Sequence, residues 1–376
     1  MKHSIHFLAL VITLVVGTAL QCSGLSITSN LMRSDSDVPM YGKTAARDFT
    51  DSSTFTFPLH QVWEYDATGG FGPNPPMIID STIFFGTLRG EFHAVGIRTG
   101  KRIGYFKTHS PIQATPAWID TTIIIGTESG DMNFFGYRID EGEVSWSKDL
   151  GGVVASPAVR NDTIFVGGLD GFLYCFDKNG RHVWSYDTKA EIRSAPCVAG
   201  PTVYCASTNG KVYAVSSADG ALRWSFSTGD AIYAGVTVQS DNVIVASRDS
   251  TVYLLDPRSG SVNHTLTIGN KIMAAPSVSN GNIYVSSLDG SVSAYRLISG
   301  EALWKFTAKA IINTTPIVTP SAVFVASLDK NLYALSPENG TLLWKMEFPA
   351  RIKTTPLVWN NFIFIAAEDK MLYCLR

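Results

Sequence analysis

Short apolar stretches alternate with polar turns along most of the chain, and the whole pattern recurs about every 40 residues up to the C-terminus. In the copy that follows Pro157, apolar stretches at 163–166 and 172–175 come after the turns Asn161-Asp162 and Asp170-Gly171. A Gly-x-x-x-Trp segment at 180–184 closes this copy. Pairs of Asn, Asp and Gly supply the positive φ angles that tight hairpins need. The pattern therefore predicts four antiparallel strands per copy, which is the blade of a β-propeller.

Two markers set the register of the copies. Each copy begins at a slot that is usually proline, and the slots are Pro76, Pro116, Pro157, Pro196, Val236, Pro276, Pro316 and Pro356. Most fourth strands carry a tryptophan after the glycine, and we expect this side chain to cover the space between neighbouring sheets; such segments lie at 142–146, 180–184, 220–224, 300–304 and 340–344. Gly104 and His264 stand where two copies should have tryptophan. The contacts beside those two blades should be looser or differently filled.

The two ends of the repeat predict how the ring closes. The last copy stops at Arg376 after its third strand, whereas residues 60–65 carry a fourth-strand tryptophan with no preceding strands. We therefore predict an all-β, eight-bladed propeller over 57–376, in which the N-terminal strand completes the last blade and removes an open sheet edge.

The N-terminus resembles an export signal. Lys2 and His3 precede an apolar run at 5–20, which is shorter than the roughly 20 residues needed to span a bilayer. Two ends of the signal are compatible with the sequence. A signal peptidase could cut after Ala19, or residues 19–22 could form a lipobox in which Cys22 is lipidated. In the second case Gln21 replaces the small residue that usually precedes the cysteine. Residues 1–22 are thus the predicted signal, and the polar stretch 23–56 is the predicted tether.

Composition and charge remove several classes of function. Charged residues make up only 16% of the chain, and 30 Lys and Arg face 32 Asp and Glu, for a net charge of -2. This charge gives no field that could hold a nucleic acid. No segment after the predicted signal is apolar enough over its length to span a membrane, so we expect contact with a membrane only through a lipid anchor.

The residue types that carry chemistry form no catalytic pattern. The seven His residues have no metal-ligand spacing. Acidic residues recur at one position of the repeat, and turn geometry accounts for them better than a catalytic role does; they are Asp170, Asp249, Asp289, Asp329 and Asp369. We predict no catalytic residue, no metal and no cofactor.

Four cysteines lie within the repeats. Cys197 and Cys205 are symmetric about Pro201 on successive predicted strands, so a cross-strand disulfide and two buried thiols are both compatible with the sequence, and we favour the thiols. Cys175 and Cys374 occupy equivalent third-strand positions and are expected in the core.

The segments 173–184 (LYCFDKNGRHVW) and 332–344 (LYALSPENGTLLW) resemble the tryptophan-docking repeat of pyrroloquinoline-quinone-type propellers. The resemblance covers about 60–376, and residues 40–43 with Arg47 resemble the lead-in segment that members share. Length, export signal, Cys22 and the eight-blade closure look most like the BamB family, the lipoproteins of the outer-membrane β-barrel assembly machine. The resemblance implies a periplasmic scaffold whose partner is a barrel-assembly subunit. Related quinone-dependent dehydrogenases are longer, and many have an adjacent cysteine pair that is absent here.

One position in the repeat is a candidate contact for a partner. In the pattern Ile/Val-x-small-x-Pro, the residue after the apolar one should point towards the propeller axis, and it is Gln113, Val154, Arg193, Tyr233, Met273, Asn313 and Lys353. This mixed ring suits a protein loop or peptide, because Tyr, Met and Arg are enriched in interfaces. The alternative is that these residues only solvate the funnel. The family resemblance adds the interblade stretches 189–193 and 229–233, which contain Ala190, Glu191 and Asp230.

We therefore expect an exported, monomeric, non-enzymatic scaffold that binds protein partners through one propeller face in the periplasm. A quinone-dependent oxidoreductase or small-ligand-binding propeller is the second hypothesis, and a sensor or cell-surface interaction module is the third. The fold alone does not separate them.

Overall fold

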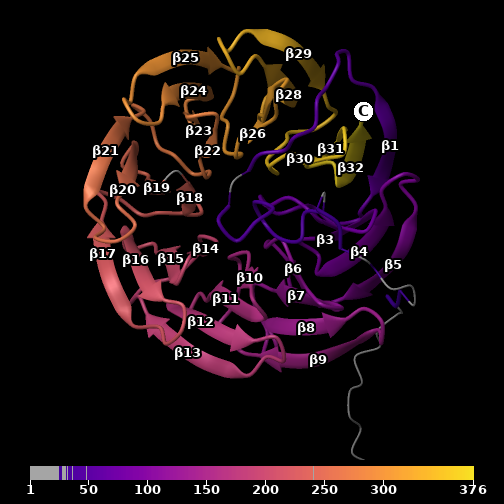
Figure 1. Ribbon diagram of the computed structural model, residues 1–376. Coiled ribbons are helices and arrows are strands. Elements are labelled where there is room, and N and C mark those ends of the chain that lie inside the picture. The colour runs from indigo at the N-terminus through magenta and orange to yellow at the C-terminus, as the bar shows by residue number, and fades with distance from the viewer. Residues whose placement is uncertain (1–24, 28–30, 32, 36, 48, 240) are drawn as a thin grey trace, which may run out of the picture.

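The computed structural model describes residues 25–27, 31, 33–35, 37–47, 49–239 and 241–376. Its strands form eight four-stranded antiparallel sheets that are arranged as the blades of a ring (Figure 1). This confirms the predicted eight-bladed propeller. The predicted signal and Cys22 lie outside the described residues, and among the described residues no helix is long and apolar enough to cross a membrane.

The blades follow the chain in order. Blade 1 contains β2 (Met77–Ile79), β3 (Thr82–Gly86), β4 (Glu91–Gly96) and β5 (Arg102–Lys107), and blade 2 contains β6 (Ala117–Ile119), β7 (Thr122–Gly126), β8 (Phe134–Arg138) and β9 (Glu143–Lys148). Blade 3 contains β10 (Ala158–Arg160), β11 (Thr163–Gly167), β12 (Phe172–Asp177) and β13 (His182–Asp187), and blade 4 contains β14 (Cys197–Ala199), β15 (Thr202–Ala206), β16 (Lys211–Ser216) and β17 (Leu222–Ser227). Blade 5 contains β18 (Thr237–Gln239), β19 (Asn242–Ala246), β20 (Thr251–Leu255) and β21 (Val262–Thr267), and blade 6 contains β22 (Ser277–Ser279), β23 (Asn282–Ser286), β24 (Ser291–Arg296) and β25 (Ala302–Thr307). Blade 7 contains β26 (Ile317–Val318), β27 (Val323–Ala326), β28 (Asn331–Leu335) and β29 (Leu342–Glu347), and blade 8 contains β30 (Leu357–Trp359), β31 (Phe362–Ala366), β32 (Met371–Leu375) and β1 (Gln61–Asp66).

Blade 8 is completed by the N-terminal strand, as the sequence predicts. β1 pairs antiparallel with β32, with Trp63 opposite Cys374 and Tyr65 opposite Leu372. The pairing extends past the strands, because the His60 and Arg376 backbones donate to each other's carbonyls at 2.9 and 3.0 Å. The first and last segments of the ring are therefore joined by an antiparallel ladder whose register shifts once, between Gln61 and Trp63.

The recurring acids serve the turns, as predicted. Asp249 accepts the backbone N–H of Thr251 at 2.9 Å and the phenolic hydroxyl of Tyr253 at 2.7 Å. Likewise, Asp329 accepts the hydroxyl of Tyr333 and Asp369 accepts the hydroxyl of Tyr373, each at an oxygen–oxygen distance of 2.6 Å. Each carboxylate thus fixes a hairpin turn and the strand that follows it.

Most tryptophans of the fourth strands dock on a glycine of the next blade. A Cβ atom added at Gly180 would lie 2.3 Å from Cδ2 of Trp146, and one at Gly220 would lie 2.7 Å from Cε3 of Trp184. The Trp184 indole N–H also donates to the carbonyl of Ser217 at 3.1 Å. The tryptophans therefore cover the space between sheets, which was their predicted role.

The two copies without tryptophan are filled differently, as expected. His264 takes the docking position over Gly300. At the Gly104 position, the space beside Gly142 is occupied by Leu25 and Ser26 from the N-terminal segment. Leu25 is fully buried, and its carbonyl accepts the Tyr137 hydroxyl at 2.7 Å. A distant segment of the chain thus replaces the missing side chain.

This docking gives a testable stability effect. Replacing Leu25 with alanine should lower the free energy of unfolding by about 2 kcal/mol, at the low end of the range for buried leucines because a terminal segment can shift to close the cavity. Equilibrium urea unfolding measures the change. The exposed Leu222 provides the control, since Leu222→Ala should change stability by less than about 0.5 kcal/mol. Equal unfolding midpoints for the two variants would contradict the docking.

The structure differs from the polar tether expected over 23–56. Within the described part of this stretch, Val38, Met40, Tyr41, Phe49 and Phe55 are buried against the propeller. The segment crosses the centre of the ring (Figure 1, indigo). The few apolar residues of this segment follow neither the helix period nor the strand period, so the sequence pattern does not predict that they are buried.

Backbone hydrogen bonds hold this segment to the inner strands, whose edges face the axis. Val38 exchanges two bonds with Ile78 at 2.9 and 3.0 Å. The carbonyls of Pro39, Ala45 and Ala46 accept the N–H groups of Trp118, Val198 and Val238, at 2.9, 2.8 and 3.1 Å. We call residues 38–47 and 49–51 the plug, because they cross the channel and satisfy inner strand edges that a closed ring leaves unpaired.

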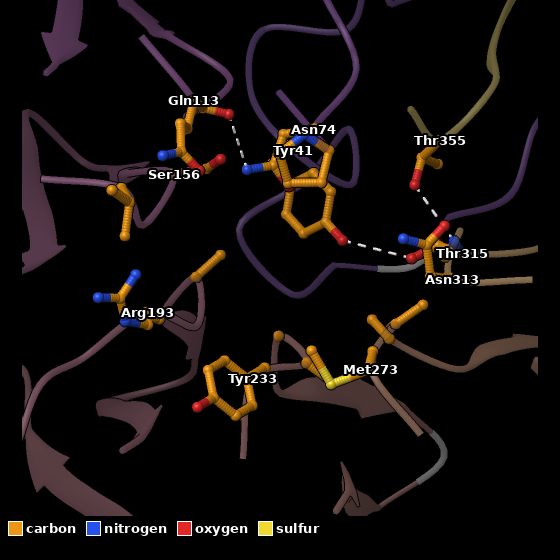
Figure 2. A pocket seen from close by; sticks show the side chains of 17 residues that line it. Tyr41, Asn74, Gln113, Ser156, Arg193, Tyr233, Met273, Asn313, Thr315 and Thr355 are labelled. Atoms are coloured by element: carbon orange, nitrogen blue, oxygen red, sulfur yellow. Dashed lines mark hydrogen bonds between the residues drawn. The ribbon is translucent and has the colours of Figure 1, made fainter. Parts of the chain in front are cut away.

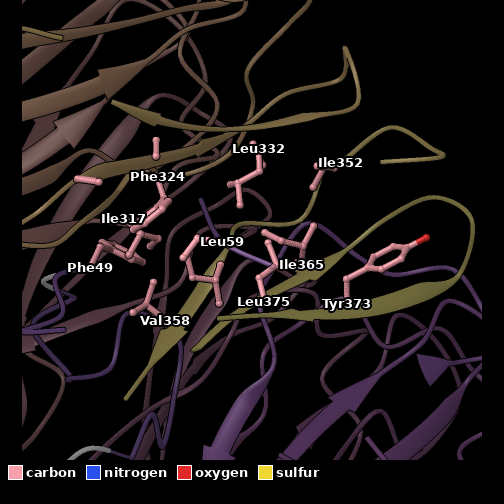
Figure 3. Packing of buried hydrophobic residues seen from close by; sticks show 14 of the residues in the cluster. Phe49, Leu59, Ile317, Phe324, Leu332, Ile352, Val358, Ile365, Tyr373 and Leu375 are labelled. Atoms are coloured by element: carbon pink, nitrogen blue, oxygen red, sulfur yellow. The ribbon is translucent and has the colours of Figure 1, made fainter. Parts of the chain in front are cut away.

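The plug also contributes to the core. Phe49 belongs to a buried cluster together with residues of blades 7 and 8, among them Phe324, Ile365 and Leu375 (Figure 3). Leu59, which precedes β1, lies in the same cluster. The segments before the repeat therefore add to the hydrophobic core of blades 7 and 8.

The register of blade 4 decides between the two cysteine alternatives. Cys197 lies opposite Tyr204, so Cys205 points to the other face of the sheet. Cys197 packs in the cluster of Tyr204, whereas Cys205 packs in the cluster of Phe165. No disulfide joins them, and burial raises the pKa of the Cys205 thiol to about 12. The disulfide alternative is therefore wrong, because it overlooked the alternation of side chains along a strand.

Candidate functional site

A cavity of about 210 Å³ lies on the propeller axis, where the inner strands begin. Six of the seven ring residues identified in the repeat line it: Gln113, Val154, Arg193, Tyr233, Met273 and Asn313. They come from six successive blade connections and converge on one space (Figure 2). Register alone thus brings them together, because each stands three residues before its proline or valine slot.

Tyr41 of the plug also lines the cavity. Its hydroxyl lies 3.3 Å from Oγ1 of Thr315, whose backbone N–H donates to Oγ1 of Thr355 at 3.2 Å (Figure 2). The side chain is buried, and desolvation raises the pKa of this tyrosine. The plug forms its backbone hydrogen bonds with residues inside the inner strands, past the ends of those strands that border the cavity. Tyr41 therefore closes the inner end of the cavity. Sequence analysis placed Tyr41 only in a lead-in segment, so this contact was missed.

A second contact from outside the regular repeat fixes one wall. Asn74 donates from Nδ2 to the carbonyl of Gln113 at 3.1 Å (Figure 2). The Gln113 side chain in turn donates to Oε2 of Glu128 at 2.9 Å. The amide of Gln113 is therefore held in place, and no sequence signal had singled out Asn74.

The opposite wall combines charge with an aromatic surface. Arg193 donates from Nε to Oε2 of Glu191 at 2.7 Å, and both side chains are more than a third exposed. The guanidinium of Arg248 lies 5.6 Å from the ring centre of Tyr233. An exposed ion pair of this kind contributes little to stability, so its groups can exchange partners at small cost.

One polar atom of the cavity lining lacks a partner within the protein. Oδ1 of Asn313 is buried and makes no hydrogen bond. An unmade bond of this kind costs about 1–3 kcal/mol. A bound segment that offers an N–H would satisfy this acceptor, and a peptide backbone has such a group at nearly every residue.

Four predicted residues do not line the cavity. Lys353 instead lies 3.3 Å from a carboxylate oxygen of Glu368. Glu191 reaches the cavity only through Arg193. Ala190 and Asp230 accept hydrogen bonds through their backbone carbonyls, from Thr188 at 2.8 Å and Thr228 at 2.7 Å. They belong to the surrounding loops, where their role in binding a partner stays a prediction.

The cavity does not suit pyrroloquinoline quinone, a planar tricarboxylate. Arg193 is the only cationic residue in its lining among the described residues, and Glu191 already binds that cation. Among the same described residues, no group of three or more His, Cys, Asp or Glu could hold a metal ion.

Fold and site together define a repeat propeller with a plugged axis and a mixed polar and apolar cavity on one face. The chain belongs to the family described as outer membrane protein assembly factor BamB, whose model matches residues 137–231, 208–321 and 288–375. This agrees with the resemblance seen in the repeats.

Solved structures with the same fold include both proteins of this family and enzymes. BamB from Moraxella catarrhalis is 18% identical with a TM-score of 0.73, covering 85% of this chain and 100% of that one. A quinohemoprotein alcohol dehydrogenase from Comamonas testosteroni is 12% identical with a TM-score of 0.77, covering 92% and 81%. A europium-containing methanol dehydrogenase is 12% identical with a TM-score of 0.78, covering 90% of each chain. At these identities the likeness concerns the fold alone.

One curated relative matches in sequence over a short stretch. Tetrathionate hydrolase from Acidithiobacillus ferrooxidans is 31% identical over 96 residues, which is 24% of this chain and 19% of that protein. The match thus spans about a fifth of the relative, or roughly two blades of this propeller.

Proposed function

We propose that this protein is an exported, non-enzymatic scaffold that binds a protein partner through the cavity face, and that it acts in outer-membrane protein assembly. The observation that carries the proposal is the axial cavity, which Tyr233, Met273 and Arg193 line together with the unpaired acceptor of Asn313. These side chains are typical of protein interfaces. Membership of the BamB family supports the same function.

The mixed chemistry of the cavity favours a protein loop over a small charged ligand. The single cation is paired, the remaining lining is neutral, and the inner end is closed by Tyr41. A loop could enter from the open face, place an apolar side chain against Met273 and offer a backbone N–H to the unpaired oxygen of Asn313. The partner that family membership suggests is a subunit of the barrel assembly machinery, with the protein attached to the outer membrane through Cys22.

The test is a detergent-solubilised pull-down of the natively exported, full-length protein, with quantitative mass spectrometry of what is captured. Arg193→Glu should lower recovery of a barrel-assembly subunit at least tenfold, because it reverses the charge at the cavity and places two carboxylates side by side. Arg258→Glu is the matched control, since it makes the same charge change in the exposed turn between β20 and β21. Its recovery should equal that of the unchanged protein.

Two outcomes would overturn the proposal. Equal recovery for both variants would remove the cavity face as the binding surface. An absorbance spectrum of the same preparation tests the enzyme alternative, since a bound quinone in the absence of a captured subunit would identify the cavity as a cofactor site.

A further inference from the structure

Two cations lie beside the axial cavity without belonging to its lining. Arg248 is in the turn between β19 and β20, and its guanidinium carbon lies 5.6 Å from the ring centre of Tyr233, a lining residue (Figure 2). Lys271 is in the connection between β21 and β22, two residues before Met273, which also lines the cavity. Both cations are on the end of the propeller where the inner strands begin, which we call the cavity face.

The repeat does not account for a cation at position 248. The backbone N–H of Arg248 donates to the carbonyl of Ala231 at 3.2 Å, and the same hydrogen bond between turn and connection recurs in the other blades. In blades 1, 3, 6 and 7 the donor is a leucine: Leu88, Leu169, Leu288 or Leu328. The turn itself therefore does not need the arginine.

Arg248 and Lys271 also lack an acid of their own. On the connection between blades 7 and 8, by contrast, Arg351 and Lys353 share the carboxylate of Glu368 at 2.7 and 3.3 Å. Among the described residues, neither Arg248 nor Lys271 forms an ion pair, although Lys271 is exposed and Arg248 is partly exposed. Their charges are therefore free to bind a group from outside the protein.

The acids beside them along the chain are held by backbone groups. Asp249 accepts the N–H groups of Gly229 and Thr251 at 2.6 and 2.9 Å. Asp230 accepts the N–H of Ala231 at 2.7 Å. Neither carboxylate forms an ion pair with a described cation, so blade 5 presents two cations that its own acids leave unbound.

The Arg248 side chain is already partly removed from water. Its Nε is buried and makes no hydrogen bond, and its guanidinium lies against the Tyr233 ring. A charge in such surroundings attracts an opposite charge more strongly than a fully hydrated one does. Arginine also binds a carboxylate through two parallel N–H···O bonds, which fixes the orientation of the bound group.

We propose that the protein segment that enters the cavity carries an acidic side chain, whose carboxylate binds Arg248 and Lys271 at the blade 5 edge of the cavity. The inference rests on the proposed function and adds the chemistry of the partner: an apolar residue that packs on Met273, with an Asp or Glu close to it in the same segment. The two cations repel a basic segment, so they also select among partners.

The experiment looks for this carboxylate by crosslinking. A carbodiimide joins a carboxylate to an amine that it contacts and adds no spacer atoms. The reagent is applied to the complex that the full-length protein captures from detergent-solubilised membranes. Mass spectrometry should find Lys271 joined to an Asp or Glu of the barrel-assembly subunit. Lys101 is the control, because it is exposed in the turn before β5, at the opposite end of the propeller, and should give no such product.

Charge reversal gives a second readout. Arg248→Glu combined with Lys271→Glu should lower recovery of the subunit by at least about tenfold, because two attractive contacts become repulsive. Arg258→Glu combined with Lys101→Glu makes the same two charge changes away from the cavity, and its recovery should equal that of the unchanged protein. Equal urea unfolding midpoints for the two double variants show that both are folded.

The outcomes separate this contact from the proposed function. A captured subunit without a Lys271 product, or equal recovery for the two double variants, would overturn the acidic contact and leave the cavity face as the binding surface tested by Arg193→Glu. Failure of the unchanged protein to capture any barrel-assembly subunit would instead overturn the proposed function, and the acidic contact with it.

Discussion

Replacing Gly180 with alanine should lower the free energy of unfolding by about 3 kcal/mol. The residue has a φ of +73°, where a side chain costs about 1–2 kcal/mol. The added Cβ would also lie 2.3 Å from Cδ2 and 2.6 Å from Cγ of Trp146. These atoms are close to the root of the indole, so the whole ring must move, and overpacking of this kind costs about 1–3 kcal/mol.

A second glycine separates the two causes. Gly200 also has a positive φ, +56°, but a Cβ there would meet no atom within 4 Å. Gly200→Ala should therefore cost only the backbone part, about 1 kcal/mol. Urea unfolding midpoints of the two variants give the difference. If both lost the same stability, tryptophan docking would not be what holds neighbouring blades together.

The repeat made the propeller predictable, because every blade solves the same packing problem with the same residue types. Three features recur at fixed spacings: the tryptophan that packs on a glycine, the acid that accepts a tyrosine hydroxyl, and the proline that begins a copy. The structure of one copy therefore predicts the structure of the others. Even the exceptions were informative: Gly104 marked the one interblade space that Leu25 fills. The ring position also predicted which residues face the cavity, since register fixes where each side chain points.

The contributions of single-copy segments could not be predicted in this way. Tyr41 and Asn74 reach the cavity from outside the regular pattern, and the plug binds mainly through backbone groups that any residue carries. Lys353 has the right register, but an acid available in the next turn binds its ammonium group. Periodicity therefore predicts position, whereas side-chain partners depend on neighbours that only the folded chain brings together.

The plug matters for function as well as stability. Through Tyr41, this segment closes the inner end of the cavity in which we propose that a partner binds. Arg47 ties the segment to the residues that begin blades 3 and 4.

Replacing Arg47 with alanine should lower the free energy of unfolding by about 4 kcal/mol. Its fully buried guanidinium donates to the carbonyls of Tyr41, Ser156, Pro157 and Pro196, the last at 2.9 Å from Nη2 and 3.1 Å from Nε. Burial lowers the pKa of Arg47 to about 10, so the group remains charged at neutral pH. Hydrogen bonds to a charged group contribute about 1.5–3 kcal/mol each, and the variant leaves several buried carbonyls without a donor.

Arg47→Lys should recover about half of the loss, because a lysine keeps the charge but cannot reach carbonyls from two blades in the same planar arrangement. Arg258→Ala, at an exposed turn, is the control and should cost less than about 0.5 kcal/mol. Limited trypsin digestion gives an independent readout: if Arg47 holds the plug in the channel, cleavage after Lys43 should become rapid in Arg47→Ala alone. An unchanged urea midpoint together with slow cleavage at Lys43 would show that the backbone pairs of the plug suffice, and that the buried arginine is not what closes the channel.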